Sequence, residues 1–149
     1  MRDSKSEQPA VVEVLSAFIR TNAPRQLTST TPSADVQAAL TVLGARDQSH
    51  DGPGTVDLAY SHLAGAMLVN AHFDRALLTG VQLQGAHLEG AELRHALLNG
   101  ATLTGAFVAR ANFTGACLNN ASLAGWKTSP TTRGLPLDMS PHCGLPPKR

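Results

Sequence analysis

Histidine is the residue type in this chain that most directly suggests chemistry, because imidazole binds metals and transfers protons near neutral pH. Four of the six histidines lie in residues 56–125, namely His62, His72, His87 and His95. A zinc site needs three or four ligands that converge within a few ångströms, and the spacing of these histidines matches no zinc motif. They form a site only if the fold brings them together.

The other reactive residue types show no catalytic pattern. The carboxylates of the same segment are scattered, and the sequence has no nucleophile elbow, phosphate loop or H-E-x-x-H motif. Cys117 and Cys143 have neither metal-site nor redox spacing, so free thiols in a reducing compartment are expected. The sequence therefore predicts no catalytic, cofactor or metal site, and a protein that is not an enzyme.

Charge and hydropathy exclude further classes. The net charge of +1 gives no electrostatic basis for binding nucleic acid. No run of residues approaches the roughly 20 apolar residues of a membrane span. The first residues, MRDSKSEQPA, lack the apolar core of a signal peptide. We therefore expect a cytoplasmic chain with no membrane span and no nucleic-acid partner.

A five-residue repeat dominates the middle of the chain. Residues 56–125 divide without a gap into 14 pentapeptides, VDLAY SHLAG AMLVN AHFDR ALLTG VQLQG AHLEG AELRH ALLNG ATLTG AFVAR ANFTG ACLNN ASLAG. The central residue is Leu in 11 of them, Phe in two and Val in one, and the first residue is Ala in 11. Helices repeat near 3.6 residues, strands near two, and leucine-rich or hexapeptide repeats have other periods. The period therefore indicates a solenoid of five-residue units.

This pattern resembles that of the pentapeptide-repeat family, A-(D/N)-L-x-x, over 70 of the 149 residues. The resemblance implies a mainly β fold, a right-handed, four-sided parallel β-helix with four pentapeptides per coil and about 3.5 coils in all. The central Leu or Phe would point inward, and the small first residue would line each corner. Gly at the fifth position, present in eight repeats, would ease the turn. Adjacent coils would pair as parallel strands about 4.8 Å apart.

Assigning successive repeats to four sides predicts which outward residues share a column. The histidines fall on different columns, with His62 on side two, His87 on side three, His72 on side four and His95 at a corner. His72 and Glu92 lie one coil apart on side four, which gives at most a pair of metal ligands. On the same side, Asp74 and Arg94 are expected to form an ion pair between coils, of a kind that contributes little when exposed.

Two outward columns are apolar. Leu77 and Leu97 stack on side one, and Met67 and Phe107 flank a histidine on side three. Exposed apolar columns often mark contacts, so these four residues form a candidate partner or dimer surface. Coverage by the chain's own helices or tail, and plain exposure, are the alternatives. Trp126, directly after the last repeat, is expected to act as a lid on the C-terminal end of the core.

Residues 1–55 are expected to form a helical segment with two helices, at about 9–21 and 33–43. The apolar stripes comprise Val11, Leu15, Phe18 and Ile19 in the first helix and Val36, Ala39, Leu40 and Leu43 in the second. Ser33 or Thr31 would cap the second helix and Gly44 would end it. Both helices would cap the N-terminal end of the β-helix near Leu58 and Leu63. The Pro-rich residues 126–149 are expected to form a loose tail.

The helical segment is also similar to the one before the repeats in a group of actinobacterial pentapeptide-repeat proteins. Those proteins commonly carry further upstream helices, often including membrane spans. This chain, which begins almost directly on the first helix, resembles a shortened bacterial member of that group.

These features together predict a non-catalytic structural or protein-interaction scaffold, with an unknown protein partner or a second copy of the chain. The alternative is a DNA mimic, because some family members resemble duplex DNA in shape and charge and bind type II topoisomerases such as DNA gyrase. Residues 56–125 carry four acidic and three basic side chains, and most second positions lack the Asp or Asn of the family. The short, nearly neutral stack argues against mimicry.

The inward and outward positions give a testable pair of neighbouring residues. We expect Leu93→Asp to abolish folding, because an unpaired carboxylate in an apolar core costs several kcal/mol. We expect Glu92→Ala to change the free energy of unfolding by less than about 1 kcal/mol, because that side chain points outward. Thermal denaturation followed by circular dichroism measures both, and similar melting curves would contradict the assignment.

Overall fold

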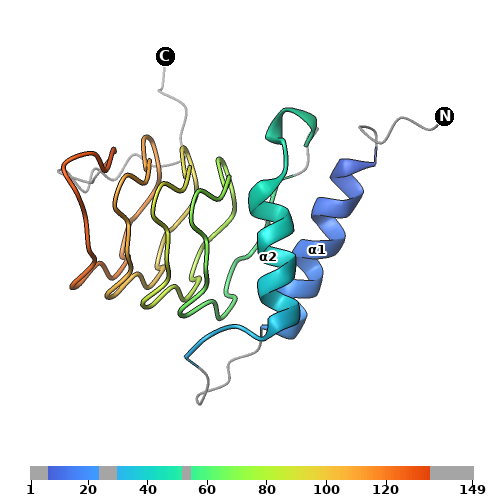
Figure 1. Ribbon diagram of the computed structural model, residues 1–149, viewed down its shortest axis with the longest axis horizontal. Helices are drawn as coiled ribbons and strands as arrows, with labels where there is room; N and C mark the ends of the chain where they lie inside the picture. The colour runs from blue at the N-terminus through green and yellow to red at the C-terminus, as the bar shows by residue number, and fades with distance from the viewer. Residues whose placement is uncertain (1–6, 24–29, 52–54, 135–149) are drawn as a thin grey trace.

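Two helices lie at one end of a stack of coils in the computed structural model, which describes residues 7–23, 30–51 and 55–134 (Figure 1). The helices are α1, Gln8–Asn22, and α2, Ala34–Ala45, and a single 3₁₀ turn follows, η2, Gln48–His50. Neither α1 nor α2 has the length and hydropathy to cross a membrane, and the described residues contain no other candidate.

Single-residue bridges join successive coils. They run parallel, and all but the last connect a second-position residue to the residue 20 positions later. The four columns are Asp57, Leu77, Leu97, Cys117 on side one; His62, Gln82, Thr102, Ser122 on side two; Met67, His87, Phe107, Lys127 on side three; and His72, Glu92, Asn112, Arg133 on side four. The four-sided coil is therefore present. The expected strands are absent from the described residues, because a turn at positions four and five leaves one bridged residue per repeat.

Three backbone hydrogen bonds per repeat hold each coil on the next. The N–H of Leu77 donates to the carbonyl of Val56 at 2.8 Å, and the N–H of Leu58 donates to the carbonyl of Leu77 at 2.9 Å. The third bond runs from the fifth-position Tyr60 to Thr79 at 2.9 Å. The same set recurs around the coil, so each repeat is fixed in register by its neighbours above and below.

Every corner of the coil has a left-handed backbone. All 14 fifth-position residues from 60 to 125 have φ between 56° and 70°. Glycine enters this region freely, whereas other residues do so at a cost of roughly 1–2 kcal/mol. The predicted role of glycine at the fifth position is confirmed. Where the residue is large, as at Tyr60 and His95, its side chain covers the glycine one coil later, and a Cβ added at Gly80 or Gly115 would collide with it.

The core is a narrow column with one large side chain per repeat. Thirteen of the fourteen central side chains, from Leu58 to Leu118, are at most 5% exposed. The expectation is wrong only for Leu123, which is partly buried because no complete coil follows it. The first-position residues from Val56 to Ala111 line the same interior and are equally buried.

The helices supply the hydrogen-bond partners that a preceding coil would have supplied. In later coils the second-position N–H donates to the coil before it, and in the first coil all four of these groups donate to the helical segment instead. The pairs are Asp57 with Ser16 Oγ at 3.4 Å, His62 with the Ala23 carbonyl at 3.4 Å, Met67 with Gln37 Oε1 at 2.9 Å and His72 with the Gly44 carbonyl at 2.9 Å. Both helices therefore cap the N-terminal edge, α1 over sides one and two and α2 over sides three and four.

The predicted apolar stripe holds for α2 and only in part for α1. Val36, Ala39, Leu40 and Leu43 of α2 are all buried. In α1, Ile19 is buried and Leu15 is partly buried as expected, but Val11 and Phe18 are exposed, and Val12 and Ser16 face the core in their place. The helix is therefore rotated from the expected orientation, with Ser16 Oγ accepting from the N–H of Asp57.

The ends of α2 refine two further expectations. Ser33 is the N-cap, and its Oγ accepts from the N–H of Val36 at 3.5 Å. Gly44 does not end the helix, which continues through Ala45. It lies instead where α2 approaches the coil most closely, since a Cβ at this position would be 2.8 Å from the Cβ of Ala71.

The C-terminal end is more ordered than the sequence suggests. Residues 126–134 were expected to begin a loose tail, but Lys127 and Arg133 add bridges to sides three and four. A turn in which the N–H of Thr132 donates to Ser129 absorbs one extra residue, so Arg133 bridges Asn112 at a spacing of 21. The nonrepeated sequence is therefore held in place by the exposed edge below it. The remainder of the expected tail, 135–149, lies outside the described residues.

Trp126 lies over the open end of the core. It packs against the core cluster while remaining partly exposed, and its ring centroid is 5.7 Å from that of Phe113. This geometry fits the expected lid, whose energetic role stays a prediction.

The close approach at Gly44 allows a test of the N-terminal cap. The expected change in the free energy of unfolding is opposite to the usual effect of replacing Gly by Ala in a helix. Replacing Gly by Ala inside a helix normally stabilises it by about 1 kcal/mol. We expect Gly44→Ala to lower the free energy of unfolding by about 1–2 kcal/mol instead, because the new methyl group forces α2 off Ala71. The matched control is Thr41→Ala at an exposed position of α2, which should stay within about 0.5 kcal/mol of wild type. A stabilised Gly44→Ala variant in urea denaturation would contradict the contact.

The lid is tested by shortening Trp126. We expect Trp126→Ala to destabilise the chain by about 2 kcal/mol, because the open end of the core loses its cover, and Trp126→Phe to lose less than half of that. Denaturant unfolding measures both values. The chain has one Trp, so its fluorescence reports on this end of the wild-type coil. If alanine and phenylalanine at this position are equally stable, Trp126 is not a lid.

Candidate functional site

The four histidines of the repeats stay apart, as the side assignment predicts. His62, His72 and His87 are bridged within three different columns, and His95 lies at a corner with φ of 58°. Glu92 is bridged to His72, but its carboxylate accepts from Asn112 Nδ2 at 3.1 Å. Within the described residues, no group of three or more His, Cys, Asp or Glu side chains is placed to hold a metal ion.

Side three carries a stacked column of rings. The rings of His87 and Phe107 are parallel, with centroids 4.6 Å apart, and the ammonium of Lys127 lies 4.3 Å from the centroid of Phe107 on the next coil. The faces of Phe107 are therefore engaged in stacking and cation–π contacts. Met67, the first residue of the column, is 54% exposed. Any partner on side three would meet Met67 and the edge of the stack.

Side one carries the other predicted apolar pair. Leu77 and Leu97 are bridged to each other and are partly buried, and Cys117, next in the column, is buried. Asp57, at the start of the column, accepts from Arg20 of α1 in an ion pair. The four candidate surface residues are thus in two separate columns, which the structure does not merge into one patch.

The predicted ion pair between coils is present on side four. Arg94 Nη2 lies 2.6 Å and Nε 2.9 Å from Asp74 Oδ2, and the backbone N–H of Arg94 donates to Asp74 Oδ1 at 2.8 Å. The hydrogen bond that Arg94 donates to Asp74 raises the pKa of the Arg94 guanidinium, so Arg94 stays charged. The contact fixes the position of this guanidinium on side four.

At the second position of a repeat, Asp or Asn makes a short side-chain turn with the backbone. The Oδ1 of Asp57 accepts from the N–H of Ala59 at 3.1 Å, and the Oδ1 of Asn112 accepts from the N–H of Thr114 at 3.1 Å. This two-residue side-chain turn satisfies the fourth-position N–H, which is not one of the three backbone bonds that recur between coils. An apolar second residue such as Leu97 offers no acceptor for that group.

Sequence reasoning missed the polar clasp beside the cap. The guanidinium of Arg46 meets the carboxylate of Asp51 through Nε at 3.0 Å and Nη2 at 2.7 Å, and both side chains are nearly buried. Arg46 Nη1 also donates to the carbonyl of His72 at 2.7 Å, and Gln8 of α1 donates to Asp51 at 2.8 Å. The clasp therefore joins both helices to the first coil. No local sequence signal marks it, because its residues come from three separate parts of the chain, Gln8, residues 46–51 and His72.

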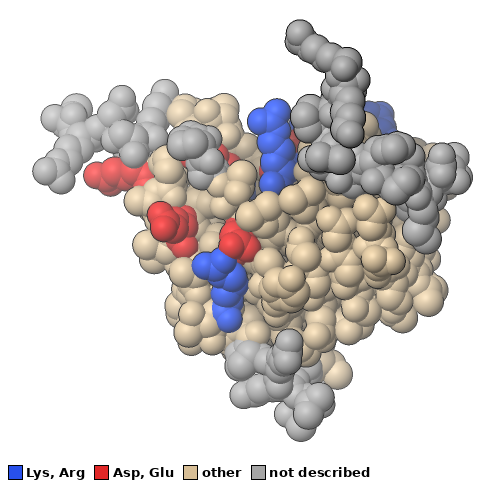
Figure 2. Space-filling view, turned by 180° about the vertical axis from the view of Figure 1, so that it is seen from behind, with Lys and Arg blue, Asp and Glu red and all other residues tan. Residues whose placement is uncertain are grey.

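Charged side chains are unevenly distributed over the surface. Figure 2 shows the side of the molecule that is hidden in Figure 1. Few Lys, Arg, Asp or Glu residues lie on this side, and most of them are toward the helices. All four acidic residues of the repeats have a partner: Asp57 with Arg20, Asp74 with Arg94, Glu92 within 3.7 Å of Arg94, and Glu89 3.3 Å from His87. The coil therefore presents no free acidic column among its described residues.

Comparison with known proteins identifies the repeats. The pentapeptide-repeat family model matches residues 57–94 and 91–125 with eight copies, and no curated protein sequence matches the chain. A pentapeptide repeat protein from the Arabidopsis thaliana thylakoid lumen is 32% identical over 52% of this chain and 55% of that chain, with a TM-score of 0.48. This chain therefore spans about half the length of that relative.

Two cyanobacterial proteins are also similar. Rfr23 of Cyanothece 51142 is 30% identical over 59% of this chain and 70% of that chain, with a TM-score of 0.34. HetL of Nostoc sp. strain PCC 7120, a protein involved in heterocyst differentiation regulation, is 33% identical over 53% of this chain and 38% of that chain, with a TM-score of 0.42. Through residues 57–125 the chain belongs to the pentapeptide-repeat family, and its coil is the right-handed, four-sided β-helix of that family.

Proposed function

We propose that the chain is a non-catalytic protein-interaction scaffold of the pentapeptide-repeat type. The observation that supports this most directly is the regular display of outward side chains in columns on a coil whose interior and N-terminal edge are satisfied by the chain itself. Such a coil holds its surface residues in fixed register, which is what a binding platform requires. The same proposal places the chain in the cytoplasm, because the spacing of its two cysteines matches no metal-site or redox motif.

The proposed partner contacts lie on two separate columns, Leu77 and Leu97 on side one and Met67 and Phe107 on side three. These apolar second positions give up the side-chain turn that Asp or Asn would provide. Met67 is 54% exposed and the other three are partly buried, so each column offers apolar surface to a partner. The partner is a protein with apolar side chains of its own, since the columns carry little charge.

No observation favours the alternative that the chain mimics DNA. Mimicry of duplex DNA needs unpaired negative charge along the stack. The acidic residues of this coil each lie beside Arg20, Arg94 or His87, and the carboxylates of Asp57 and Asp74 accept hydrogen bonds from an arginine. Inhibition of gyrase supercoiling by the purified chain would overturn this judgement.

The proposed surface is tested by placing charge on it. We expect Leu97→Glu and Met67→Glu to abolish capture of a partner that the wild-type chain retains from its host lysate, because each buries a carboxylate against an apolar contact. Quantitative mass spectrometry measures the bound proteins. The control is Thr114→Glu, the same new charge at an exposed outward position on side four.

Circular dichroism separates binding from folding in this experiment. If Leu97→Glu lowers the melting temperature and leaves capture intact, the column is covered by the chain itself and the partner surface is assigned wrongly. Equal loss of capture in the Thr114→Glu control would also contradict the assignment.

A further inference from the structure

The outer face of the helical layer is apolar and exposed. Val14 is 66% exposed, Val42 is 55% exposed, and Val11 and Phe18 also lie on the surface. Small residues complete this face, which we call the outer helical face: Ala10, Val11, Val14, Ala17 and Phe18 of α1 and Ala38, Val42 and Ala45 of α2, all of them exposed. Helical spacing places three exposed polar residues on the same side of the layer: Glu7 and Thr21, each seven residues from Val14, and Asp35, seven residues before Val42.

A helical layer with apolar residues on both faces has the character of an interior layer. α1 packs Val12 and Ile19 toward the coil, yet carries Val11, Val14 and Phe18 on its outer side. A helix that ends a solenoid normally has a polar outer face, because the terminal unit must be soluble. The outer helical face thus lacks the polarity expected of a terminal cap.

We propose that the outer helical face binds a second copy of the chain, so that two coils are joined end to end through their helices. The area is sufficient: the exposed fractions correspond to about 500 Å² of mainly apolar surface per copy, and about 1,000 Å² in the pair reaches the lower limit for a specific interface. Glu7 lies two helical turns from Val14, so a two-fold axis near Val14 with antiparallel α1 helices keeps the two copies of Glu7 apart, and no like charges oppose each other.

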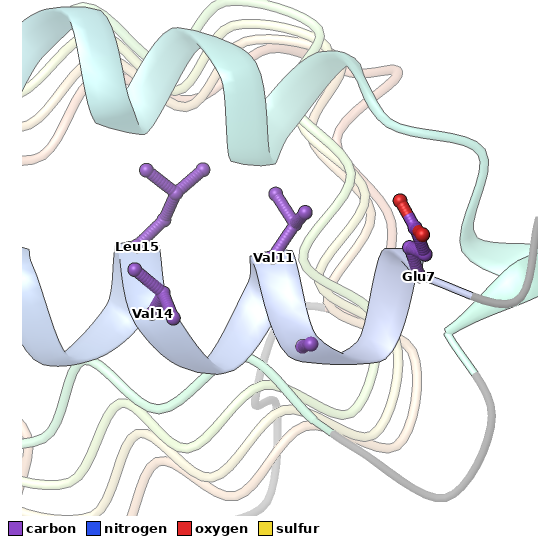
Figure 3. Close-up of a pocket in the computed structure, with 5 residues that line it drawn as sticks. Glu7, Val11, Val14 and Leu15 are labelled. Carbon is purple, nitrogen blue, oxygen red and sulfur yellow. The ribbon is translucent and has the colours of Figure 1, made fainter. Parts of the chain in front are cut away.

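The shape of α1 gives this contact a register. A hollow of about 360 Å³ is lined by Glu7, Ala10, Val11, Val14 and Leu15, and Figure 3 shows Val11 and Leu15 on the side of α1 that faces α2. Phe18 lies seven residues beyond Val11, about 10 Å along the helix. A two-fold axis perpendicular to α1 and close to Val14 therefore places Phe18 of each copy over the hollow of the other, with the two α1 helices antiparallel.

The association is tested by sedimentation velocity on the full chain over a range of concentrations. We expect the wild-type chain to be a dimer and Val14→Asp to raise the dissociation constant by about 100-fold or more, because the carboxylate would be buried unpaired at the centre of the interface. The matched control is Val69→Asp, the same change at an exposed valine of the coil, which should leave the dimer intact. Circular dichroism should show both variants folded.

The register is tested by cross-linking. In a Cys143→Ser background, mild oxidation of Val14→Cys should give a disulfide-linked dimer, because the two-fold axis brings the two copies of residue 14 together. Val69→Cys should remain monomeric on a non-reducing gel. A wild-type chain that is monomeric at all concentrations overturns the proposal. So does a dimer that Val14→Asp leaves intact, or one that cross-links through residue 69 instead of residue 14.

Discussion

The left-handed residue at every fifth position is the constraint on which the rest of the structure depends. It turns the chain after each bridged residue, which limits pairing to single bridges and sets the side length at five residues. Four such corners return the chain to its starting column after 20 residues, so equal side chains stack on one another. The inward Leu or Phe, the small first residue and the outward columns all follow from this turn. Glycine makes it without cost, and five of the six other corner residues, all but Asn120, donate a hydrogen bond to the next coil.

A coil of this kind has unsatisfied backbone groups at both ends, and the two ends are completed differently. At the N-terminal edge, the side-chain amide of Gln37 reproduces a backbone pair, since it donates to the carbonyl of Met67 and accepts from the N–H of the same residue, both at 2.9 Å. At the other end, residues up to 134 adopt the coil path although their sequence does not repeat. The exposed edge therefore acts as a template, which explains why a segment without the repeat still joins the fold.

The sequence predicts well the features that the five-residue repeat determines, because the role of each residue there depends only on its position within the repeat. Inward residues, corners, columns and the pair of Asp74 and Arg94 were all predictable. The rotation of α1 was not, because stripes containing Val11 or Val12 both have helical spacing and a single hydrogen bond to Ser16 decides between them. The clasp of Arg46 and Asp51 and the role of Gly44 depend on contacts between distant segments, which no local pattern encodes.

Second positions show where folding and function make different demands. The side chains of Asp57 and Asn112 accept a hydrogen bond from the N–H two residues later, and Asp or Asn is the residue that the family pattern has at this position. Leu77, Leu97 and Phe107 provide no such acceptor, and the N–H groups of Thr79, Asn99 and Ala109 make no hydrogen bond within the described residues. The missing hydrogen bond costs about 1 kcal/mol per repeat. Contacts along the columns offset part of this cost, since Leu77 and Leu97 are bridged and partly buried, and Phe107 stacks on His87 with the ammonium of Lys127 over its ring. An apolar second residue thus exchanges the side-chain turn for contacts within its own column.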